Sequence, residues 1–158
     1  MDLQLNNKTA FISGSTAGIG FSIAKALADE GANVIVNGRS ESSVKQAIKS
    51  LKSTAKGNVD GFAGDLSIAA EAEKLTKQFP EVDILINNLG IFEPVPFEEI
   101  ADEDWQRFFD VNVLSGVRLT RAYLPAMKQQ NWGRVIFISS ESGVQIPAEM
   151  IHYGMTKA

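Results

Sequence analysis

The sequence predicts a doubly wound α/β fold with a mainly parallel sheet of five strands. Short apolar runs alternate with amphipathic segments of helical length along all 158 residues. The cores of three of these runs, VIV, ILI and VIFI, are continuous rather than alternating. Such runs are typical of strands that helices cover on both faces. Strands that alternate with helices form βαβ units with right-handed crossovers, and we expect one domain over residues 1–158.

The first half of the chain supplies two strand–helix units. A strand at residues 9–13 leads through a glycine loop, residues 14–20, into a helix that runs to about residue 30. Gly31 is expected to end this helix. A second strand follows at residues 33–36. A second helix is expected over residues 41–53, because its apolar residues recur at helical spacing: Val44, Ala47, Ile48 and Leu51.

The second half continues the same alternation. A weaker third strand is expected at residues 58–63, followed by a helix over 67–79 that Pro80 ends. The fourth strand is expected at residues 82–86. After a loop that contains Pro94 and Pro96, the pattern predicts one continuous helix over 102–129 and a fifth strand at 135–138. We see no repeat, linker or low-complexity segment.

Composition excludes several classes of protein. The net charge is -4, whereas a nucleic-acid binder usually carries a basic face. The chain has no cysteine and one histidine, so we expect neither disulfides nor a metal site. No apolar stretch reaches the roughly 18 residues of a membrane span, and the N-terminus lacks a signal peptide pattern. We therefore expect a cytoplasmic protein with no membrane or nucleic-acid partner.

The glycine loop is the first candidate binding site. Its residues Gly14-Ser15-Thr16-Ala17-Gly18-Ile19-Gly20 connect the first strand to the first helix. Glycines let a phosphate approach the backbone, and the following helix offers free N–H groups and the positive end of its dipole. An ordinary strand–helix turn is the alternative. The position after the first strand favours a dinucleotide, with Gly14, Thr16, Gly18, Ile19 and Gly20 as binding residues. The lysine of nucleoside-triphosphate loops is missing after Gly20.

The end of the second strand indicates which dinucleotide binds. An acidic residue there would accept hydrogen bonds from a ribose 2′-hydroxyl and repel a 2′-phosphate. Asn37 is neutral, and the guanidinium of Arg39 can pair with a phosphate. The sequence therefore favours NADP(H) over NAD(H). A solvated Arg39 with no ligand is the alternative.

A tyrosine, a lysine and a serine form the candidate catalytic group. Tyr153 and Lys157 lie four residues apart, which places them on one face if the segment is helical. A nearby ammonium group stabilises a phenolate and makes proton exchange at neutral pH more effective. Ser140 follows the fifth strand, at the edge where ligands of α/β proteins bind. Its hydroxyl can donate to a substrate carbonyl, or it only satisfies the backbone of a turn.

In combination these features resemble the classical short-chain dehydrogenase/reductase family, a Rossmann-fold family. The resemblance extends over the whole chain, through the glycine loop, Asp65 in GDLS, the segment NNLG at residues 87–90, Asn112, Ser140, Tyr153 and Lys157. It implies that Ser140 positions a carbonyl, Tyr153 is the general acid–base, and Lys157 holds the nicotinamide ribose and eases ionisation of the tyrosine. It implies that Asn112 anchors a proton-relay water. It also assigns to the cofactor pocket Asp65, Leu66, Asn88, Leu89 and Gly90.

Each of these assignments has a structural alternative. In these alternatives Asp65 only caps the helix expected from residue 67, Asn88 only satisfies loop backbone, and Asn112 only bends its helix without binding a water. The acidic residues at 98–104 are expected to compensate a helix dipole rather than bind metal. His152 is assigned no role and is expected to be solvated or at the edge of the core.

Two departures from the family pattern affect these expectations. Leu89 stands where the family usually has alanine, so we expect a reshaped loop on the adenine side of the pocket. The sequence stops one residue after Lys157, whereas family members continue through the rest of that helix and two more strands. We therefore expect the N-terminal part of a longer reductase, with an open sheet edge at residues 135–138 and limited turnover for the isolated 158 residues.

Three functions remain open at this point. The first is an oxidoreductase that moves hydride between NADP(H) and a small carbonyl or alcohol substrate, as a homo-oligomer by resemblance. The second is a dinucleotide-binding module without catalysis. The third is an interaction protein that shares only the architecture and binds no cofactor. Substrate identity and reaction direction are not encoded in a recognisable way.

Overall fold

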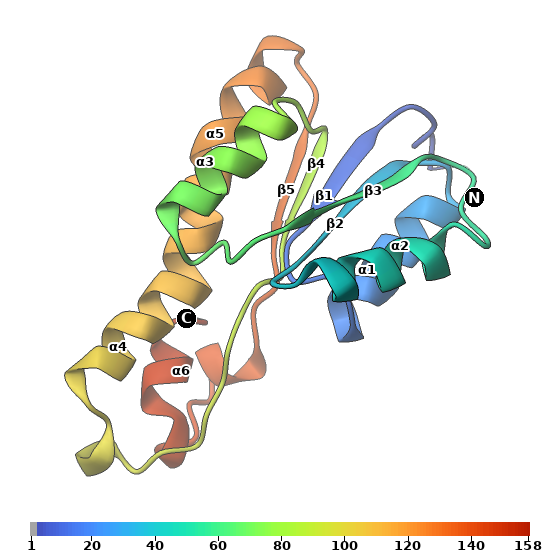
Figure 1. The fold of residues 1–158 in the computed structure, drawn as a ribbon. Helices are drawn as coiled ribbons and strands as arrows, with labels where there is room; N and C mark the ends of the chain where they lie inside the picture. Colours follow the sequence, from blue (N-terminus) through green and yellow to red (C-terminus); the bar gives the residue numbers. More distant parts are fainter. Residues whose placement is uncertain (1–2) are drawn as a thin grey trace.

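Five parallel strands form one sheet in the computed structural model, which describes residues 3–158 (Figure 1). The order across the sheet is β3-β2-β1-β4-β5, so β2 and β3 are added on one side of β1 and β4 and β5 on the other. This arrangement confirms the predicted doubly wound Rossmann fold. The strands are β1 (Thr9–Ile12), β2 (Asn33–Gly38), β3 (Val59–Ala63), β4 (Ile84–Asn87) and β5 (Arg134–Phe137).

The helices follow the strands as the sequence predicts, with shifts of a few residues at their ends. Gly31 has a φ of +93°, a conformation that favours glycine, directly after the first helix. The α-helices are α1 (Gly18–Asp29), α2 (Glu41–Leu51), α3 (Ala69–Gln78), α4 (Asp102–Phe109), α5 (Ser115–Gln129) and α6 (Ile151–Met155). No helix within residues 3–158 has both the length and the apolar character that a membrane crossing needs.

Two apolar cores cover the two faces of the sheet, as expected for continuous apolar strands. Alternate residues of each strand point to opposite faces, so neighbours in one strand join different cores. In β1, Ile12 packs with α1 and α2, whereas Phe11 packs with α3 and α5. Figure 1 shows α1 and α2 on one side of the sheet and α3 and α5 on the other. The carboxyl ends of the strands lie between these layers, where a site is expected.

The predicted helix over residues 102–129 forms without a break, but one segment of it is not α-helical. A π-helical turn, Asp110–Leu114, separates α4 from α5. The hydroxyl of Ser115 donates to the carbonyl oxygen of Val111 (2.6 Å) within this wider turn. Turns of this kind arise from tertiary contacts and are frequent at functional sites, and this one contains Asn112.

Strand β5 lies at a sheet edge, as predicted, but its helical cover differs from the expectation. Its apolar run predicted cover on both faces, but Ile136 and Phe137 are 46% and 52% exposed. Within residues 3–158, β5 is one of the two edge strands, and α5 packs on one of its faces. The apolar pattern of β5 is therefore that of a buried strand, while its surroundings in this structure are those of an edge.

Candidate functional site

Two loops are joined at the carboxyl edge of the sheet by Ser13 and Asn88. The hydroxyl oxygen of Ser13 accepts hydrogen bonds from the N–H groups of Asn88 (3.0 Å) and Leu89 (2.9 Å). The carboxamide of Asn88 donates to the carbonyl oxygens of Ser13 and Gly14, both at 3.0 Å. Since Ser13 follows β1 and Asn88 follows β4, these bonds fix the glycine loop against the loop after β4.

Asn37 supports the same loop from the end of β2. Its Oδ1 accepts the N–H of Gly14 (3.0 Å), and its Nδ2 donates to the carbonyl oxygens of Phe62 (3.2 Å) and Gly64 (3.1 Å). The hydroxyl oxygen of Ser15 accepts the Asn37 N–H (2.9 Å). Asn37 is buried, so its amide shapes the loop rather than facing solvent.

The glycine loop adopts a conformation that other residues would disturb. Gly14 and Gly18 have φ values of +60° and +59°, in the left-handed region. A Cβ on Gly20 would lie 2.6 Å from the carbonyl oxygen of Gly14. Helix α1 begins at Gly18, and no side chain among the described residues caps its N-terminus at Ala17. The first N–H groups of α1 are therefore available to an anion.

A cavity of about 170 Å³ lies beside this loop. Leu89 contributes to its wall, on the side where the sequence predicts that a bulkier residue reshapes the pocket. Arg39 is exposed at its rim. Six predicted cofactor residues line this cavity together: Gly14, Thr16, Asn37, Arg39, Asp65 and Leu66.

Asp65 also makes local hydrogen bonds near the start of α3, which is close to its structural alternative as a helix cap. Its Oδ1 accepts hydrogen bonds from the N–H (3.0 Å) and the hydroxyl (2.7 Å) of Ser67. These bonds form a turn ahead of α3, which begins at Ala69. Asp65 therefore holds the chain between β3 and α3, while it also lines the cavity beside the glycine loop.

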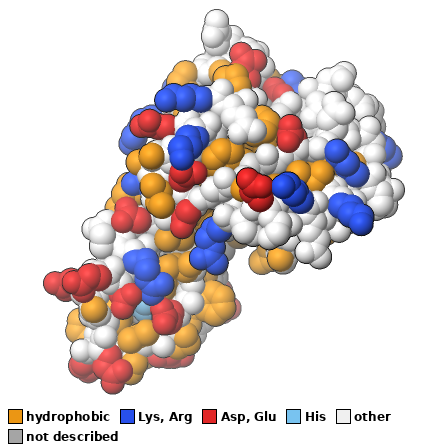
Figure 2. Space-filling view, in the orientation of Figure 1, with side chains coloured by type: hydrophobic (Ala, Val, Ile, Leu, Met, Phe, Trp, Pro, Cys, Tyr) orange, Lys and Arg blue, Asp and Glu red, His pale blue; other side chains and the backbone are white. Residues whose placement is uncertain are grey.

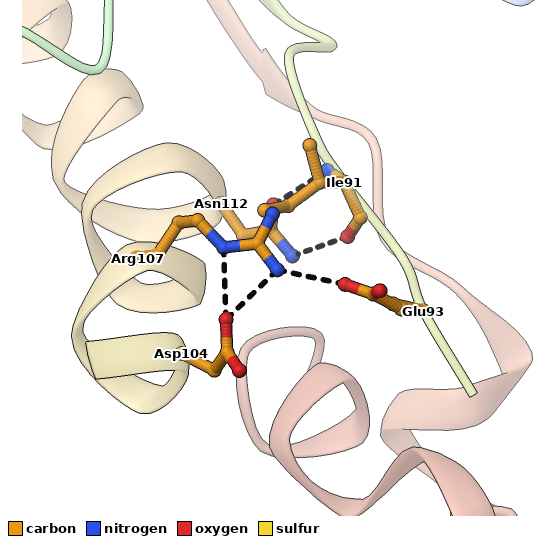
Figure 3. A network of polar contacts seen from close by, with 5 residues as sticks. All are labelled: Ile91, Glu93, Asp104, Arg107 and Asn112. Atoms are coloured by element: carbon orange, nitrogen blue, oxygen red, sulfur yellow. Dashed lines mark hydrogen bonds and ion pairs between the residues drawn. The ribbon is translucent and has the colours of Figure 1, made fainter. Parts of the chain in front are cut away.

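Asn112 connects the loop after β4 to the C-terminal segment, as Figure 3 shows for its first partner. Its Oδ1 accepts the N–H of Ile91 (2.8 Å), and its Nδ2 donates to the Ile91 carbonyl oxygen (3.0 Å). The same Nδ2 donates to the hydroxyl of Thr156 (2.9 Å). A Cβ on Gly90 would lie 3.4 Å from Nζ of Lys157 and 3.5 Å from Oδ1 of Asn112. Three predicted site residues thus lie close together: Asn112, Gly90 and Lys157.

Lys157 is half-buried at the same place. Its ammonium group donates to the carbonyl oxygen of Ile138 (2.9 Å) and lies 5.8 Å from the ring centre of Tyr153. Burial lowers the pKa of Lys157, because the charged form loses hydration. A cavity of about 480 Å³ opens here, with Leu89, Asn112, Ser139, Thr156 and Lys157 in its wall.

Tyr153 and Ser140 come from two segments that pack closely. The hydroxyl of Ser140 accepts the N–H of Ser142 (3.2 Å) in a 3₁₀ turn, Glu141–Gly143. A Cβ on Gly154 would lie 2.8 Å from the carbonyl oxygen of Ser142, so this turn and α6 pack in direct contact. Within the described residues, neither Tyr153 nor Ser140 lines the 480 Å³ cavity.

Sequence reasoning missed three hydroxyl residues that build this site: Ser13, Ser15 and Thr156. The signal for Ser13 and Ser15 was their position beside Gly14, at the carboxyl end of a strand. Thr156 lies inside the segment that links Tyr153 to Lys157, and only the fold shows that its partner is Asn112.

Three of the five acidic residues predicted to compensate a helix dipole lie at the start of α4, whereas Glu98 and Glu99 lie in the preceding 3₁₀ turn, Phe97–Glu99. Asp102, Glu103 and Asp104 occupy its first turn. Figure 2 shows acidic side chains gathered at the end of the molecule that α4 forms. Across residues 3–158, no group of three or more His, Cys, Asp or Glu side chains is arranged to hold a metal ion.

Comparison with known proteins decides the family. A family model described as short chain dehydrogenase matches residues 8–158. The chain belongs to the short-chain dehydrogenase family. YvaG, an uncharacterized oxidoreductase of Bacillus subtilis (strain 168), is 51% identical over 158 residues, which cover 99% of this chain and 60% of YvaG. D-beta-hydroxybutyrate dehydrogenase of Cupriavidus necator is 40% identical, over 98% of this chain and 61% of that protein.

A solved structure of this family has the same fold. L-sorbose reductase from Gluconobacter frateurii, complexed with NADPH and L-sorbose, is 34% identical with a TM-score of 0.92. The match covers 99% of this chain and 61% of the reductase. The chain thus spans 60–61% of the length of these three family members.

The packing at Gly20 predicts a specific cost for a side chain there. Gly20→Ala is expected to lower the free energy of unfolding by about 1–3 kcal/mol, because its Cβ forces the backbone of the glycine loop to move. Ala26→Ser, on the exposed face of the same helix, is the control and is expected to change it by less than about 0.5 kcal/mol. Urea unfolding measures both variants. A loss at Gly20 no larger than that of the control would contradict the close packing.

Proposed function

We propose that the chain forms the dinucleotide-binding part of an oxidoreductase, which transfers hydride between NADP(H) and a small carbonyl or alcohol substrate. One observation carries the proposal: the open start of α1 and the Asn112–Lys157 group lie at the same carboxyl edge, on either side of the loop after β4. This edge is the point where strand order reverses, which is where ligands of doubly wound folds bind. Membership of the short-chain dehydrogenase family supports the same chemistry.

The residues beside the glycine loop suit a dinucleotide. A Cβ on Gly18 would meet nothing within 4 Å, so a pyrophosphate can approach the backbone there, while Gly14 and Gly20 let the loop pack closely. Thr16 and Ile19 would flank that approach. Asp65 and Leu66 line the cavity that would take the adenosine end. Asn37 and Asn88 hold the loop in shape through their backbone hydrogen bonds.

Arg39 is the proposed determinant for the 2′-phosphate of NADP(H). Its side chain is exposed at the rim of the adenosine cavity, and Asn37 leaves that end of β2 without a carboxylate. A guanidinium can bind a phosphate with two parallel hydrogen bonds. The structurally similar L-sorbose reductase was solved with NADPH, which is consistent with this preference.

The second half of the site suits proton transfer. When bound, the nicotinamide ring would supply or accept the hydride. Tyr153 is proposed to exchange a proton with the substrate oxygen, and Ser140 to donate a hydrogen bond to it. Lys157 lies near the Tyr153 ring and would hold the nicotinamide ribose, while Asn112 fixes the Ile91 backbone and positions a relay water.

A second candidate is dinucleotide binding without catalysis. The hydroxyl of Ser140 accepts the N–H of Ser142 in a 3₁₀ turn, and neither Tyr153 nor Ser140 lines the 480 Å³ cavity beside Lys157. Both observations favour a segment that shapes the fold over one that performs chemistry. Substitution of Tyr153 separates the two candidates.

Tyr153→Phe is expected to reduce turnover by about 10²-fold or more, because it removes the proposed acid–base group. The dissociation constant for NADPH is expected to change little. Tyr123→Phe is the matched control. Tyr123 is the only other tyrosine in the sequence; it is buried in the core, and its hydroxyl donates to the Phe79 carbonyl oxygen. Steady-state rates and fluorescence titration test both variants in the complete encoded polypeptide. Unchanged turnover in Tyr153→Phe would overturn the catalytic proposal.

Arg39→Asp is expected to weaken NADPH binding by roughly tenfold to hundredfold, because a charged hydrogen bond to the 2′-phosphate is lost. NADH binding is expected to change far less. Arg121→Asp, an exposed arginine of α5 on the opposite face of the sheet, makes the same charge change away from the site. Equal losses for the two cofactors in Arg39→Asp would show that this residue does not select between them.

A further inference from the structure

Packing against neighbouring elements sets the position of the helix that carries Tyr153. α6 (Ile151–Met155) contacts α4 and the 3₁₀ turns Glu141–Gly143 and Ala148–Met150. A catalytic side chain must be held closely, because a displacement of about 1 Å can reduce a rate roughly 10²-fold. The contacts that hold α6 therefore bear directly on the proposed role of Tyr153.

His152 provides the most buried of these contacts. It is 1% exposed and directly precedes Tyr153 in the chain. Its ring centre lies 4.0 Å from that of Phe108 and 5.9 Å from that of Trp105, both on α4. The sequence predicted an imidazole that is solvated or at the edge of the core, and this prediction is wrong. The rings that bury His152 belong to α4, more than 40 positions earlier in the chain.

The chemistry of this pocket fits a packing role for the imidazole. Nδ1 of His152 is buried and has no hydrogen-bond partner among the described residues. To carry a proton to a substrate, the imidazole would need polar groups that connect this nitrogen to the substrate. The rings of Phe108 and Trp105 lie next to the imidazole instead. The ring is therefore held by its aromatic faces and edges rather than by polar bonds.

A second contact links α4 to Tyr153 indirectly, through Phe92 and Glu93 of the loop after β4. The ring of Phe92 lies 6.2 Å from that of Tyr153, in an edge-to-face arrangement. Next to Phe92 in the chain, Glu93 pairs with Arg107 of α4 (2.7 Å), as Figure 3 shows. This pair is exposed, so it contributes less than the buried His152 packing.

We propose that His152 is a positioning residue: its ring, packed against Phe108 and Trp105 of α4, sets the placement of Tyr153 for proton transfer. The inference rests on the proposed function, in which Tyr153 is the acid–base group. It requires an aromatic ring at position 152 but neither of its nitrogens. Phe92 and the Arg107–Glu93 pair give a weaker support from the other side.

Two substitutions of His152 test this role in the complete encoded polypeptide. His152→Ala removes the ring and is expected to lower kcat roughly tenfold to hundredfold, with the NADPH dissociation constant within about twofold of wild type. His152→Phe keeps an aromatic ring and removes the unpartnered nitrogen. It is expected to retain kcat within about threefold and to leave the pH profile of kcat unchanged. Circular dichroism establishes that each variant is folded at the assay temperature.

Phe108→Leu is a second test of the positioning role, which applies even if His152→Ala fails to fold. It removes the ring against His152 with a smaller change in volume, and it is expected to lower kcat while cofactor affinity is retained. Wild-type kcat in both His152→Ala and Phe108→Leu would overturn the positioning role. A His152→Phe enzyme as slow as His152→Ala would also overturn it, because the imidazole nitrogens would then be needed.

The Tyr153→Phe variant, measured in parallel, separates this inference from the proposed function. Loss of turnover in Tyr153→Phe with full activity in His152→Ala would reject only the positioning role. Full activity in Tyr153→Phe would reject the proposed function itself, whatever the His152 variants do.

Discussion

The hydrogen bonds between Ser13 and the loop after β4 determine the geometry of the site. A single buried hydroxyl accepts from two successive N–H groups, of Asn88 and Leu89, and the Asn88 amide returns two bonds to the backbone around Gly14. These contacts extend the pairing of β1 with β4, in which the Ser13 N–H donates to the Ile86 carbonyl oxygen (3.1 Å), into the two loops. Buried polar groups that are satisfied in this way specify one arrangement, because each unpaired alternative is costly.

The two halves of the site are connected through the backbone that follows Asn88. Gly90 and Ile91 continue from this anchor to Asn112, whose amide also holds Thr156 next to Lys157. The π-helical turn places Asn112 where it can contact both segments. The proposed cofactor half and the proposed catalytic half are therefore connected by hydrogen bonds of the loop after β4, in addition to the packing of the sheet.

Much of the fold was predictable from the sequence, because it depends on local patterns. Continuous apolar runs located β2, β4 and β5, and Gly31 and Pro80 ended helices where expected. The glycine loop was located for the same reason, since its conformation needs glycine at Gly14 and Gly18. Family resemblance then indicated which polar residues belong together, and the structure places Asn112 and Lys157 beside each other.

Other features were not predictable, because distant contacts determine them. The amide of Asn37 is used by backbone groups of the glycine loop and the segment after β3, which no local pattern reveals. The burial of His152 depends on two rings of α4. The apolar pattern of β5 predicted a covered strand, but cover is a property of its neighbours and not of its own residues.

The central claim is that the loop fixed by Ser13 and Asn88 binds the phosphates of a nicotinamide dinucleotide. Titration of the complete encoded polypeptide with NADPH, followed by nicotinamide fluorescence and calorimetry, tests it most directly. We expect one saturable site whose signal NADP⁺ displaces. The absence of any saturable response up to millimolar NADPH would contradict the claim.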